Sequence, residues 1–306
     1  MSSPAEAAEA LGGAGPGDTV CLSGDGLRDA DLVLARSGVP GRPVVLSGNG
    51  TEVASVRVEA DHVVVEGVVT SGDGIDLSGE GLVARDNEVR NAALDGISCQ
   101  RPCAEVLVED NTVVGTDGTG ILVEGQVITV RGNTVSGSIR REAGDADGIR
   151  FFGFQVRLLD NIVTDIKDDG YVGEPPHTDC FQTFDNSRPP TVDAVIRGNV
   201  CRNVDAQCLI ATAQESGEEG AVGRSHTIDF SDNVCDVEGS QAVLVQWVPE
   251  VRVRGNSLAG AQLDRGAIFL DGSTNAEFSG NTVSEGVPPY EIDPASTPGF
   301  VTDRPR

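Results

Sequence analysis

The sequence predicts an all-β protein, a single-stranded right-handed parallel β-helix of about ten turns. The first observation is a repeated segment in which asparagine follows Gly or Asp and is soon followed by Val or Leu. It recurs at Asn87, Asn111, Asn133, Asn161, Asn199, Asn233, Asn256 and Asn281. A unit of roughly 23 residues with three short alternating runs is typical of one turn of such a helix. Asparagine suits the turn because it tolerates the left-handed conformation, and its amide can bond to the turns above and below.

A second pattern follows each asparagine by about a dozen residues, in line with one strand per turn. It is a small residue followed by an apolar one, and it begins with Gly74-Ile75 and ends with Gly266-Ala267. If the apolar member points inward, alternation places the next residue outward. The predicted outward column contains Asp76, Ser98, Leu122, Arg150, Gln182, Ile210 and Leu244. A leucine-rich repeat fold is excluded because the leucine spacing of such repeats is absent, and a β-propeller is excluded because its repeat units are longer.

The two ends of the chain differ from the repeats. Ser3-Pro4-Ala5-Glu6 is a capping box with Pro at the first helical position, so residues 1–16 are predicted to form a short capping helix and lead-in. The β-helix is predicted for residues 1–290 including this cap, and residues 291–306, rich in proline, as an irregular tail. No secretory signal is visible at the start.

Composition limits the possible partners. The 306 residues include 48 acidic and 22 basic side chains, giving a formal net charge of -26. This charge disfavours nucleic acid and anionic membrane surfaces, and no apolar run is long enough to span a bilayer. Glycine is abundant and aromatic residues are few, which indicates many turns and short strands.

Three long repeat units indicate where function lies. They begin at Asn133, Asn161 and Asn199, and their excess residues lie at 136–146, 165–178 and 213–226. Insertions in a solenoid collect on one face and build walls. Because the first two precede the outward column and the third follows it, we expect a groove with a floor at 147–152, 179–184 and 207–212. Such a groove suits an extended polymer.

The predicted catalytic residues gather at this groove. His177 lies two residues before Asp179, so a carboxylate can orient the imidazole or raise its pKa. The alternative is that His177 only caps a turn. The remaining candidates on the same insertion are Lys167, Asp168, Asp169 and Tyr171.

Substrate-binding residues are predicted on the floor and farther along it. Arg150 and Gln182 share the outward column and suit an anionic or hydroxyl-rich ligand. Phe152 and Phe184 are expected to stack on sugar rings, or else to form a small covered core beneath the loops. A further subsite is expected at Gln246 and Trp247.

The aspartates have three interpretations. Asp147, Asp168, Asp169 and Asp179 could hold Ca²⁺, which takes six to eight oxygen ligands. Alternatively, two of them act as general acid and base on a glycosidic bond. A purely structural role is also open, because Asp73 and Asp95 occupy the same column in turns without insertions. No organic cofactor is expected.

The seven cysteines suggest three bridges. Cys201 and Cys235 follow successive ladder asparagines by two residues, Cys180 and Cys208 match in the other register, and Cys99 and Cys103 flank a short turn. Stacked turns bring such pairs within disulfide range, which leaves Cys21 unpaired. The alternative is a set of buried thiols. No zinc motif is present, and the paired columns favour a secreted or cell-surface protein over a cytoplasmic one.

The first turns resemble a known superfamily. Gly17-Asp18-Thr19-Val20, Asp29-x-Asp31-Leu32 and the segment 37–46 (SGVPGRPVVL) are similar to the opening turns of chondroitinase B and alginate lyases. These enzymes belong to the pectate-lyase-like superfamily of right-handed β-helices. The resemblance covers about 60 residues in its specific part, and the asparagine turns extend it at superfamily level. Those lyases use a catalytic Lys/Arg pair, whereas Lys167 is the only lysine here.

The sequence therefore predicts a carbohydrate-active enzyme, and most directly a polysaccharide lyase that acts by β-elimination on a uronate-containing glycan. His177 or Lys167 would take the proton at C5, Arg150, Gln182 or Ca²⁺ would neutralise the uronate, and Tyr171 would protonate the leaving oxygen. A glycoside hydrolase, a C5-epimerase and a non-catalytic sugar-binding or adhesion β-helix are the alternatives. A monomer is expected more than a trimer.

Overall fold

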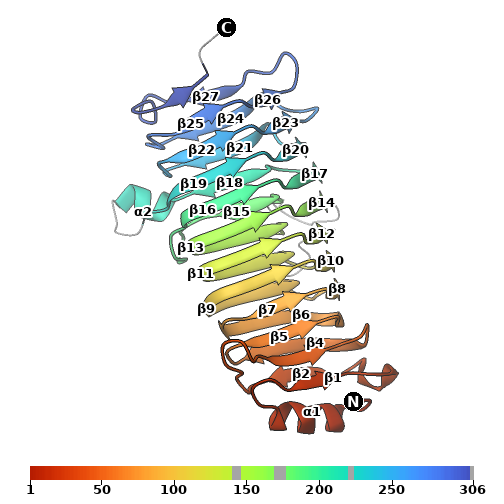
Figure 1. Ribbon diagram of the computed structural model, residues 1–306. Coiled ribbons are helices and arrows are strands. Elements are labelled where there is room, and N and C mark those ends of the chain that lie inside the picture. Colours follow the sequence, from red (N-terminus) through yellow and green to blue (C-terminus); the bar gives the residue numbers. More distant parts are fainter. Residues whose placement is uncertain (140–145, 169–176, 220–223, 304–306) are drawn as a thin grey trace.

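The structure is a computed structural model that describes residues 1–139, 146–168, 177–219 and 224–303. Its strands are parallel and stack turn upon turn into one right-handed β-helix, with the N-terminal helix at one end and the C-terminus at the other (Figure 1). The predicted fold class is confirmed. No helix among the described residues is long and apolar enough to cross a membrane.

Each turn contributes to three sheets. Sheet 1 contains β2 (Asp31–Leu34), β4 (Glu52–Glu59), β6 (Val69–Glu80), β9 (Ile97–Glu109), β11 (Ile121–Arg131), β13 (Ile149–Leu159), β15 (Phe181–Thr183), β18 (Leu209–Thr212), β21 (Gln241–Gln246), β24 (Arg265–Leu270) and β27 (Tyr290–Ile292).

Sheet 2 contains β1 (Thr19–Cys21), β3 (Val44–Ser47), β5 (Val63–Glu66) and β7 (Val83–Arg85), then the second halves of β9, β11 and β13, and then β16 (Val192–Arg197), β19 (His226–Ser231), β22 (Val251–Arg254), β25 (Glu277–Ser279) and β28 (Val301–Thr302). Strands β9, β11 and β13 thus bend from sheet 1 into sheet 2 without interruption.

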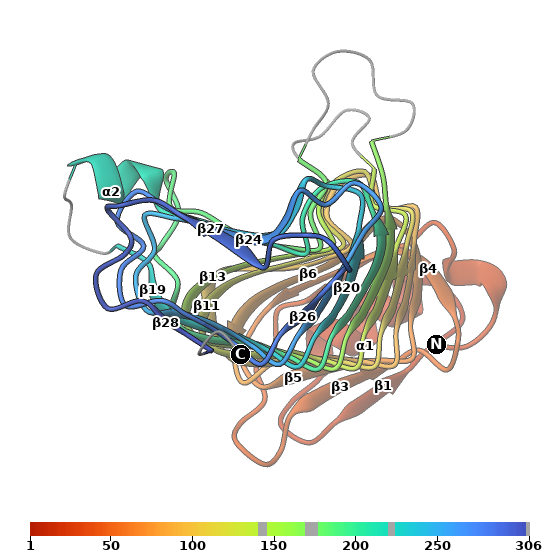
Figure 2. The same ribbon diagram turned by 90° about the horizontal axis from the view of Figure 1, so that it is seen from above.

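Sheet 3 begins with the first residues of β4 and β6 and continues with β8 (Glu88–Arg90), β10 (Thr112–Val114), β12 (Thr134–Ser136), β14 (Ile162–Ile166), β17 (Val200–Val204), β20 (Val234–Val237), β23 (Ser257–Ala259) and β26 (Thr282–Val283). Viewed along the axis, the sheets enclose one continuous core (Figure 2).

The core confirms the predicted inward column of sheet 1. Successive members pair directly in register and are 0–1% exposed, and they are Ile75, Ile97, Ile121, Ile149, Phe181, Leu209 and Val243. Burying one such side chain stabilises the fold by about 1.5–3 kcal/mol relative to leaving it exposed. The repeat therefore places a large apolar side chain in the core at every turn.

The asparagine ladder lies where sheet 2 turns into sheet 3. Asn161 is typical, because its Nδ2 donates to Oδ1 of Asn199 and to the carbonyl oxygen of Val130, both at 3.0 Å. Its own Oδ1 accepts from the backbone N and the Nδ2 of Asn133, also at 3.0 Å. The same pattern runs from Asn87 to Asn281. The amides therefore bond to the turns above and below, as predicted, but the left-handed conformation belongs to the Gly or Asp before each asparagine and not to the asparagine itself.

The N-terminal end is capped as the sequence indicates. Helix α1 (Pro4–Gly13) has Ser3 as its N-cap, whose Oγ accepts from the backbone N of Glu6 at 3.4 Å, and it buries Ala7 and Leu11 against the first turn. A short 3-10 helix, η1 (Asp25–Leu27), follows.

The C-terminal tail is more regular than expected. The predicted irregular segment 291–306 instead contributes to β27 and β28, which pair with β24 and β25. Pro288, Pro289 and Pro298 lie in the connections outside the strands, where a missing N–H costs no ladder bond. The last turn of the β-helix therefore extends to Thr302.

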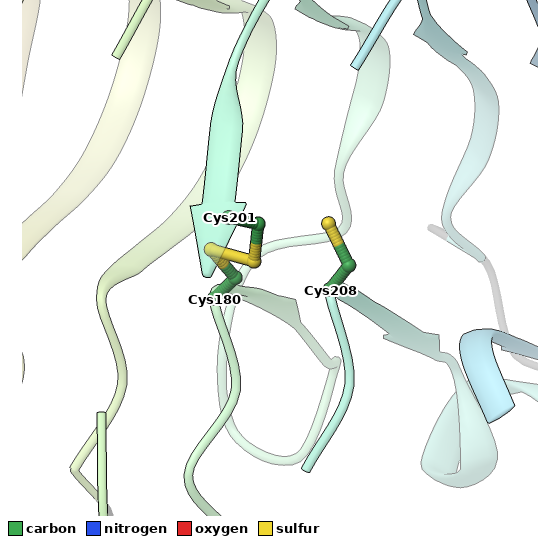
Figure 3. Close-up of side chains that lie close together, drawn as sticks. All are labelled: Cys180, Cys201 and Cys208. Carbon is green, nitrogen blue, oxygen red and sulfur yellow. A yellow bond between two sulfur atoms is a disulfide. The ribbon is translucent and has the colours of Figure 1, made fainter. Parts of the chain in front are cut away.

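The disulfides correct part of the predicted pairing. Cys99–Cys103 is confirmed, but the other two bridges join Cys180 to Cys201 and Cys208 to Cys235. The predicted stacking itself is right, since Cys201 and Cys235 are register partners. The bonds nevertheless cross between the two columns, because sulfur atoms of both columns lie within reach of each other (Figure 3). Cys21 is free and exposed.

Candidate active site

A groove is expected on the outward face of sheet 1, and one of its walls is described. Helix α2 (Gln214–Glu219) and the connection 184–191 both follow strands of sheet 1, and α2 stands out from the barrel beside that sheet (Figures 1 and 2). The other expected wall, 136–146 and 165–178, falls largely outside the described residues. Asp169 and Tyr171 also lie outside them.

The wall is held together by short-range polar contacts. Oδ2 of Asp185 accepts from the backbone N of Ser216 at 2.9 Å, and Oδ1 accepts from the backbone N of Glu215 at 3.2 Å. The Glu215 carboxylate in turn accepts from the backbone N of Ser187 at 2.7 Å. The connection 184–191 and α2 therefore form one unit.

Trp247 packs against helix α2 of this wall. A Cβ on Gly217 would lie 2.4 Å from Cδ1 of Trp247, so the indole packs directly against α2. Trp247 is only partly exposed and also packs against the core. Its neighbour Gln246 donates from Nε2 to Oδ2 of Asp271 at 2.7 Å. The structure thus gives Trp247 an anchoring position, and its predicted role as a sugar subsite stays a prediction.

Arg150 is the centre of a buried polar cluster on the floor. It is 8% exposed, and its Nε donates to Oδ2 of Asp147 at 2.5 Å and to Oε1 of Gln182 at 2.8 Å. Gln182 pairs with Arg150 across adjacent strands, as the predicted outward column requires. Since the guanidinium is fixed by two partners, it is a preorganised positive charge beneath the groove.

The aspartates of the floor also bind the backbone of the next turn. Oδ1 of Asp147 accepts from the backbone N of Asp179 at 2.9 Å, and Oδ1 of Asp179 accepts from the backbone N of Gln207 at 2.8 Å. Asp95 does the same with the backbone N of Thr119 at 2.9 Å. The aspartates of this column therefore have the structural role given above as one alternative, because they bond to the backbone of the next turn. Asp147 also forms an ion pair with Arg150.

Phe152 and Phe184 differ in how much of each ring is exposed. Phe152 points outward but is 0% exposed, so the expected stacking surface is not open at this ring. It contacts Phe184 edge to face, with 4.9 Å between ring centroids, and the guanidinium of Arg188 lies 5.3 Å from its centroid. Phe184 is only partly buried and faces the guanidinium of Arg150 at 5.7 Å. The structure corrects Phe152 to the covered satellite core.

Arg188 is a floor residue that the sequence did not reveal. It starts in the connection 184–191 but reaches back across two strands, where its NH1 donates to Glu124 at 2.9 Å and to Gln100 at 3.3 Å. Its side chain remains 29% exposed, whereas that of Glu124 is 7% exposed. The only signal was the 38-residue spacing from Asn161 to Asn199, because the connection lies outside the repeat pattern.

Asp95 has a perturbed acidity. Burial raises the pKa of its carboxyl, and the hydrogen bond from Thr119 together with the charges of Arg150 and Arg188 only partly offsets this effect. Asp95 is thus a carboxyl group that holds its proton more strongly than usual in the field of two arginines. A raised pKa of this kind is typical of general acids.

Lys167 and Asp168 lie at the described edge of the incomplete wall. Nζ of Lys167 contacts Asp205 at 2.7 Å and Glu238 at 3.1 Å. Burial lowers the pKa of Lys167, but its hydrogen bonds to these carboxylates outweigh this and leave the pKa raised. Burial raises the pKa of Asp205, but the hydrogen bonds from Lys167 and Asp168 lower it more. The pKa of Asp205 is therefore below its usual value. A raised pKa makes Lys167 a poor general base.

His177 is exposed and stands directly after an undescribed segment. Asp179, two residues later, is 0% exposed. The predicted proximity of the imidazole and this carboxylate therefore stays a prediction.

A calcium site is not completed by the described carboxylates. In the described parts of the chain, one group of three possible metal ligands has its ligand atoms within 4.8 Å of one another. It consists of Cys180, Cys201 and Cys208, whose sulfur atoms are all bonded in disulfides. Asp147, Asp168 and Asp179 form no such group, and Asp147 is already paired with Arg150. The described donor set does not fit Ca²⁺ without further ligands.

Comparison with solved structures shows which proteins have a similar fold. No protein-family model and no curated protein matches the sequence. An alginate lyase from Paenibacillus sp. str. FPU-7 matches in structure with a TM-score of 0.65 and 15% identity, over 96% of this chain and 98% of that one. The chain shares the right-handed parallel β-helix fold of this lyase.

Two further structures contain the same fold within longer chains. The catalytic unit of a GH87 α-1,3-glucanase from Streptomyces thermodiastaticus strain HF3-3 matches with a TM-score of 0.58 and 13% identity, over 95% of this chain and 61% of that one. A mutant of the PL6 family alginate lyase AlyGC matches with a TM-score of 0.58 and 15% identity, over 98% of this chain and 41% of that one. Identities this low show the common fold, so the reaction is argued from the groove.

Proposed function

We propose that the protein is a polysaccharide lyase that binds a uronate-containing glycan along sheet 1 and cleaves it by β-elimination. The observation that carries this proposal is the gathering of Arg150 and Arg188 on one floor in a chain of net charge -26. The field of both arginines acts on the Asp95 carboxyl. Each arginine already pairs with a carboxylate, Arg150 with Asp147 and Arg188 with Glu124, so an anionic ligand would bind at the exposed part of the Arg188 guanidinium.

The proposed step divides the work among few residues. Arg188, with the exposed part of its guanidinium, binds the uronate carboxylate, and Arg150 adds a fixed positive charge beneath it. Neutralising the carboxylate acidifies the proton at C5. His177 removes this proton, the C4–O4 bond breaks, a C4=C5 double bond forms, and the leaving oxygen takes a proton from Tyr171 or water.

The test is a panel of polymers with two readouts. Alginate, polygalacturonate and chondroitin are compared with neutral xylan and β-glucan, and each mixture is assayed for the ultraviolet absorbance of unsaturated uronate and for new reducing ends. We expect both signals with at least one uronate polymer. A chelator in a parallel reaction tests the predicted calcium requirement.

Two arginine variants make the test specific. In Arg188→Gln, we expect kcat/KM to fall by roughly 10–100-fold, because a charge-assisted hydrogen bond contributes about 1.5–3 kcal/mol. Arg85→Gln is the matched control, since Arg85 also pairs with a glutamate, Glu66 at 2.6 Å, but on sheet 2. Equal activity of the two variants, or no unsaturated product from any polymer, would contradict the lyase proposal.

A glycoside hydrolase is the second candidate, favoured by the raised pKa of Asp95. A carboxyl with a raised pKa is better suited to protonate a glycosidic oxygen. Reducing ends without ultraviolet absorbance, lost in Asp95→Asn, would support this reading against the lyase.

We further propose that the protein works in an oxidising, extracellular setting and as a monomer. Three disulfides support the first part, because such bonds persist outside the reducing cytosol. Mass spectrometry of the protein from its native host, without reductant, tests the disulfides, and light scattering tests the monomer.

A further inference from the structure

A concave site lies away from the expected sheet 1 groove, at the bend from sheet 1 into sheet 2. We call it the bend cleft. It has a volume of about 730 Å³, and its lining includes Glu80, Ala104, Gln126, Phe154 and Val192. These five residues are successive register partners, one from each turn. At a strand spacing of about 4.8 Å, the cleft runs roughly 19 Å parallel to the helix axis.

The floor of the cleft is backbone rather than side chain. Gly125 and Gly153 stack at the bend, and a Cβ on Gly153 would lie 1.9 Å from the carbonyl oxygen of Gly125. A side chain at Gly125 or Gly153 would clash with the backbone of the preceding turn, although Cys103 occupies the equivalent position one turn before Gly125. Pro189 and Pro190, from the connection 184–191, also line the cleft.

One aromatic ring is presented in this cleft. Phe154 is 46% exposed, in contrast to the fully buried Phe151 and Phe152 beside it in β13. The lining as a whole is mainly apolar, with the carboxylates of Asp61 and Glu80 and the amide of Gln126 as its polar groups. A mostly apolar concavity of this size with a few polar groups is typical of ligand sites.

The charges of the cleft differ from those of the sheet 1 groove. The cleft is lined by two carboxylates and by no basic side chain among the described residues, whereas the floor of sheet 1 holds Arg150 and Arg188, each paired with a carboxylate. An anionic glycan is therefore disfavoured in the bend cleft. Carboxylate and amide groups accept and donate hydrogen bonds to hydroxyls, and the face of an aromatic ring packs on the apolar face of a pyranose.

We propose that the bend cleft is a second carbohydrate site, which binds neutral sugar residues of an extended glycan. This site is separate from the catalytic groove and does not depend on which reaction the groove performs. Its neutral ligand and the anionic substrate of the groove would be different chains or different stretches of one mixed polymer.

The experiment is a titration calorimetry series with β-1,4-linked hexamers of xylose, glucose and mannose, and with hexagalacturonate as the anionic comparison. We expect at least one neutral hexamer to bind. Phe154→Ser should weaken this binding about tenfold, a loss of about 1.4 kcal/mol, because the variant lacks the aromatic face that packs on the sugar. Glu80→Gln should weaken it less.

Val127→Ser is the matched control. Val127 is 48% exposed, follows Gln126 on the same strand, and does not line the cleft. This variant should bind like the unmodified protein, and thermal unfolding of both variants checks that they are folded. Arg188→Gln, which impairs the catalytic groove, should also bind neutral hexamers normally.

Three results would overturn the proposal. One is the absence of binding by every neutral hexamer, and another is equal binding by the Phe154 and Val127 variants. The third is loss of binding in Arg188→Gln, which would place the ligand in the groove. If instead the neutral binding persists while no polymer is cleaved, the bend cleft stands and only the proposed enzymatic function fails.

Discussion

Replacement of Asn161 by Ala tests how much the asparagine ladder contributes to stability. Asn161 is 0% exposed, and its side chain makes four hydrogen bonds of 3.0 Å, two donated and two accepted. Alanine leaves the backbone N of Asn133 without its side-chain acceptor and the carbonyl oxygen of Val130 without its side-chain donor. Each buried group orphaned in this way costs about 1–3 kcal/mol, so the free energy of unfolding should fall by about 2–6 kcal/mol.

The same change at the end of the ladder provides the control. Asn281 accepts from Asn256 and donates to the carbonyl oxygen of Val253 at 2.8 Å, but it is only half-buried, so water can replace part of what is lost. We expect Asn281→Ala to cost about 1–2 kcal/mol. Asn161→Asp should cost more than Asn161→Ala near neutral pH, because a buried carboxylate cannot donate to Val130 or Asn199.

The assay is urea unfolding followed by circular dichroism, with the slope of the transition compared between variants. Amide hydrogen exchange of the turns around Asn161 would detect a local opening that the global transition misses, as can occur in a solenoid. If Asn161→Ala loses no more stability than Asn281→Ala, the ladder is not a buried hydrogen-bond network of the strength inferred here.

Three further predictions concern ionisation and cross-links. Burial raises the pKa of Asp95, so the folded state binds its proton more tightly than the unfolded state, and stability falls as the pH rises from the ordinary value of 3.8 through the folded pKa. Asp95→Asn should therefore be more stabilising, relative to the unmodified protein, at neutral pH than below pH 3.8 in thermal scans; a pH-independent difference would contradict this. Replacing Cys208 and Cys235 together by Ser should cost about 3–4 kcal/mol in urea unfolding, as for other loops of this length, and peptide mapping should recover Cys208 linked to Cys235 rather than to Cys180. Lys167→Gln should cost about 1 kcal/mol or less, with a loss that shrinks in high salt because the ion pairs are partly exposed; a loss unaffected by salt would refute that account.

The repeat by itself determined the architecture. Because each turn repeats the same inward and outward positions, the column from Ile75 to Val243 and the ladder from Asn87 to Asn281 could be assigned residue by residue. Arg150 beside Gln182 followed from the same register. Residues that obey the period are predictable because their neighbours in space are their counterparts one turn away.

Positions outside the period were decided only by the tertiary structure. The connection 184–191 has no counterpart in other turns, so no register indicated that Arg188 would return to Glu124 and cover Phe152. The period placed Asp95 but could not give its raised pKa, which results from burial and is only partly offset by two arginines from other turns. The cysteine columns were likewise correct, yet their pairing was not, since sulfurs across the columns lie as close as sulfurs along them. The sequence determines which turn a residue occupies, whereas side-chain reach between turns and columns is settled only when the whole chain packs.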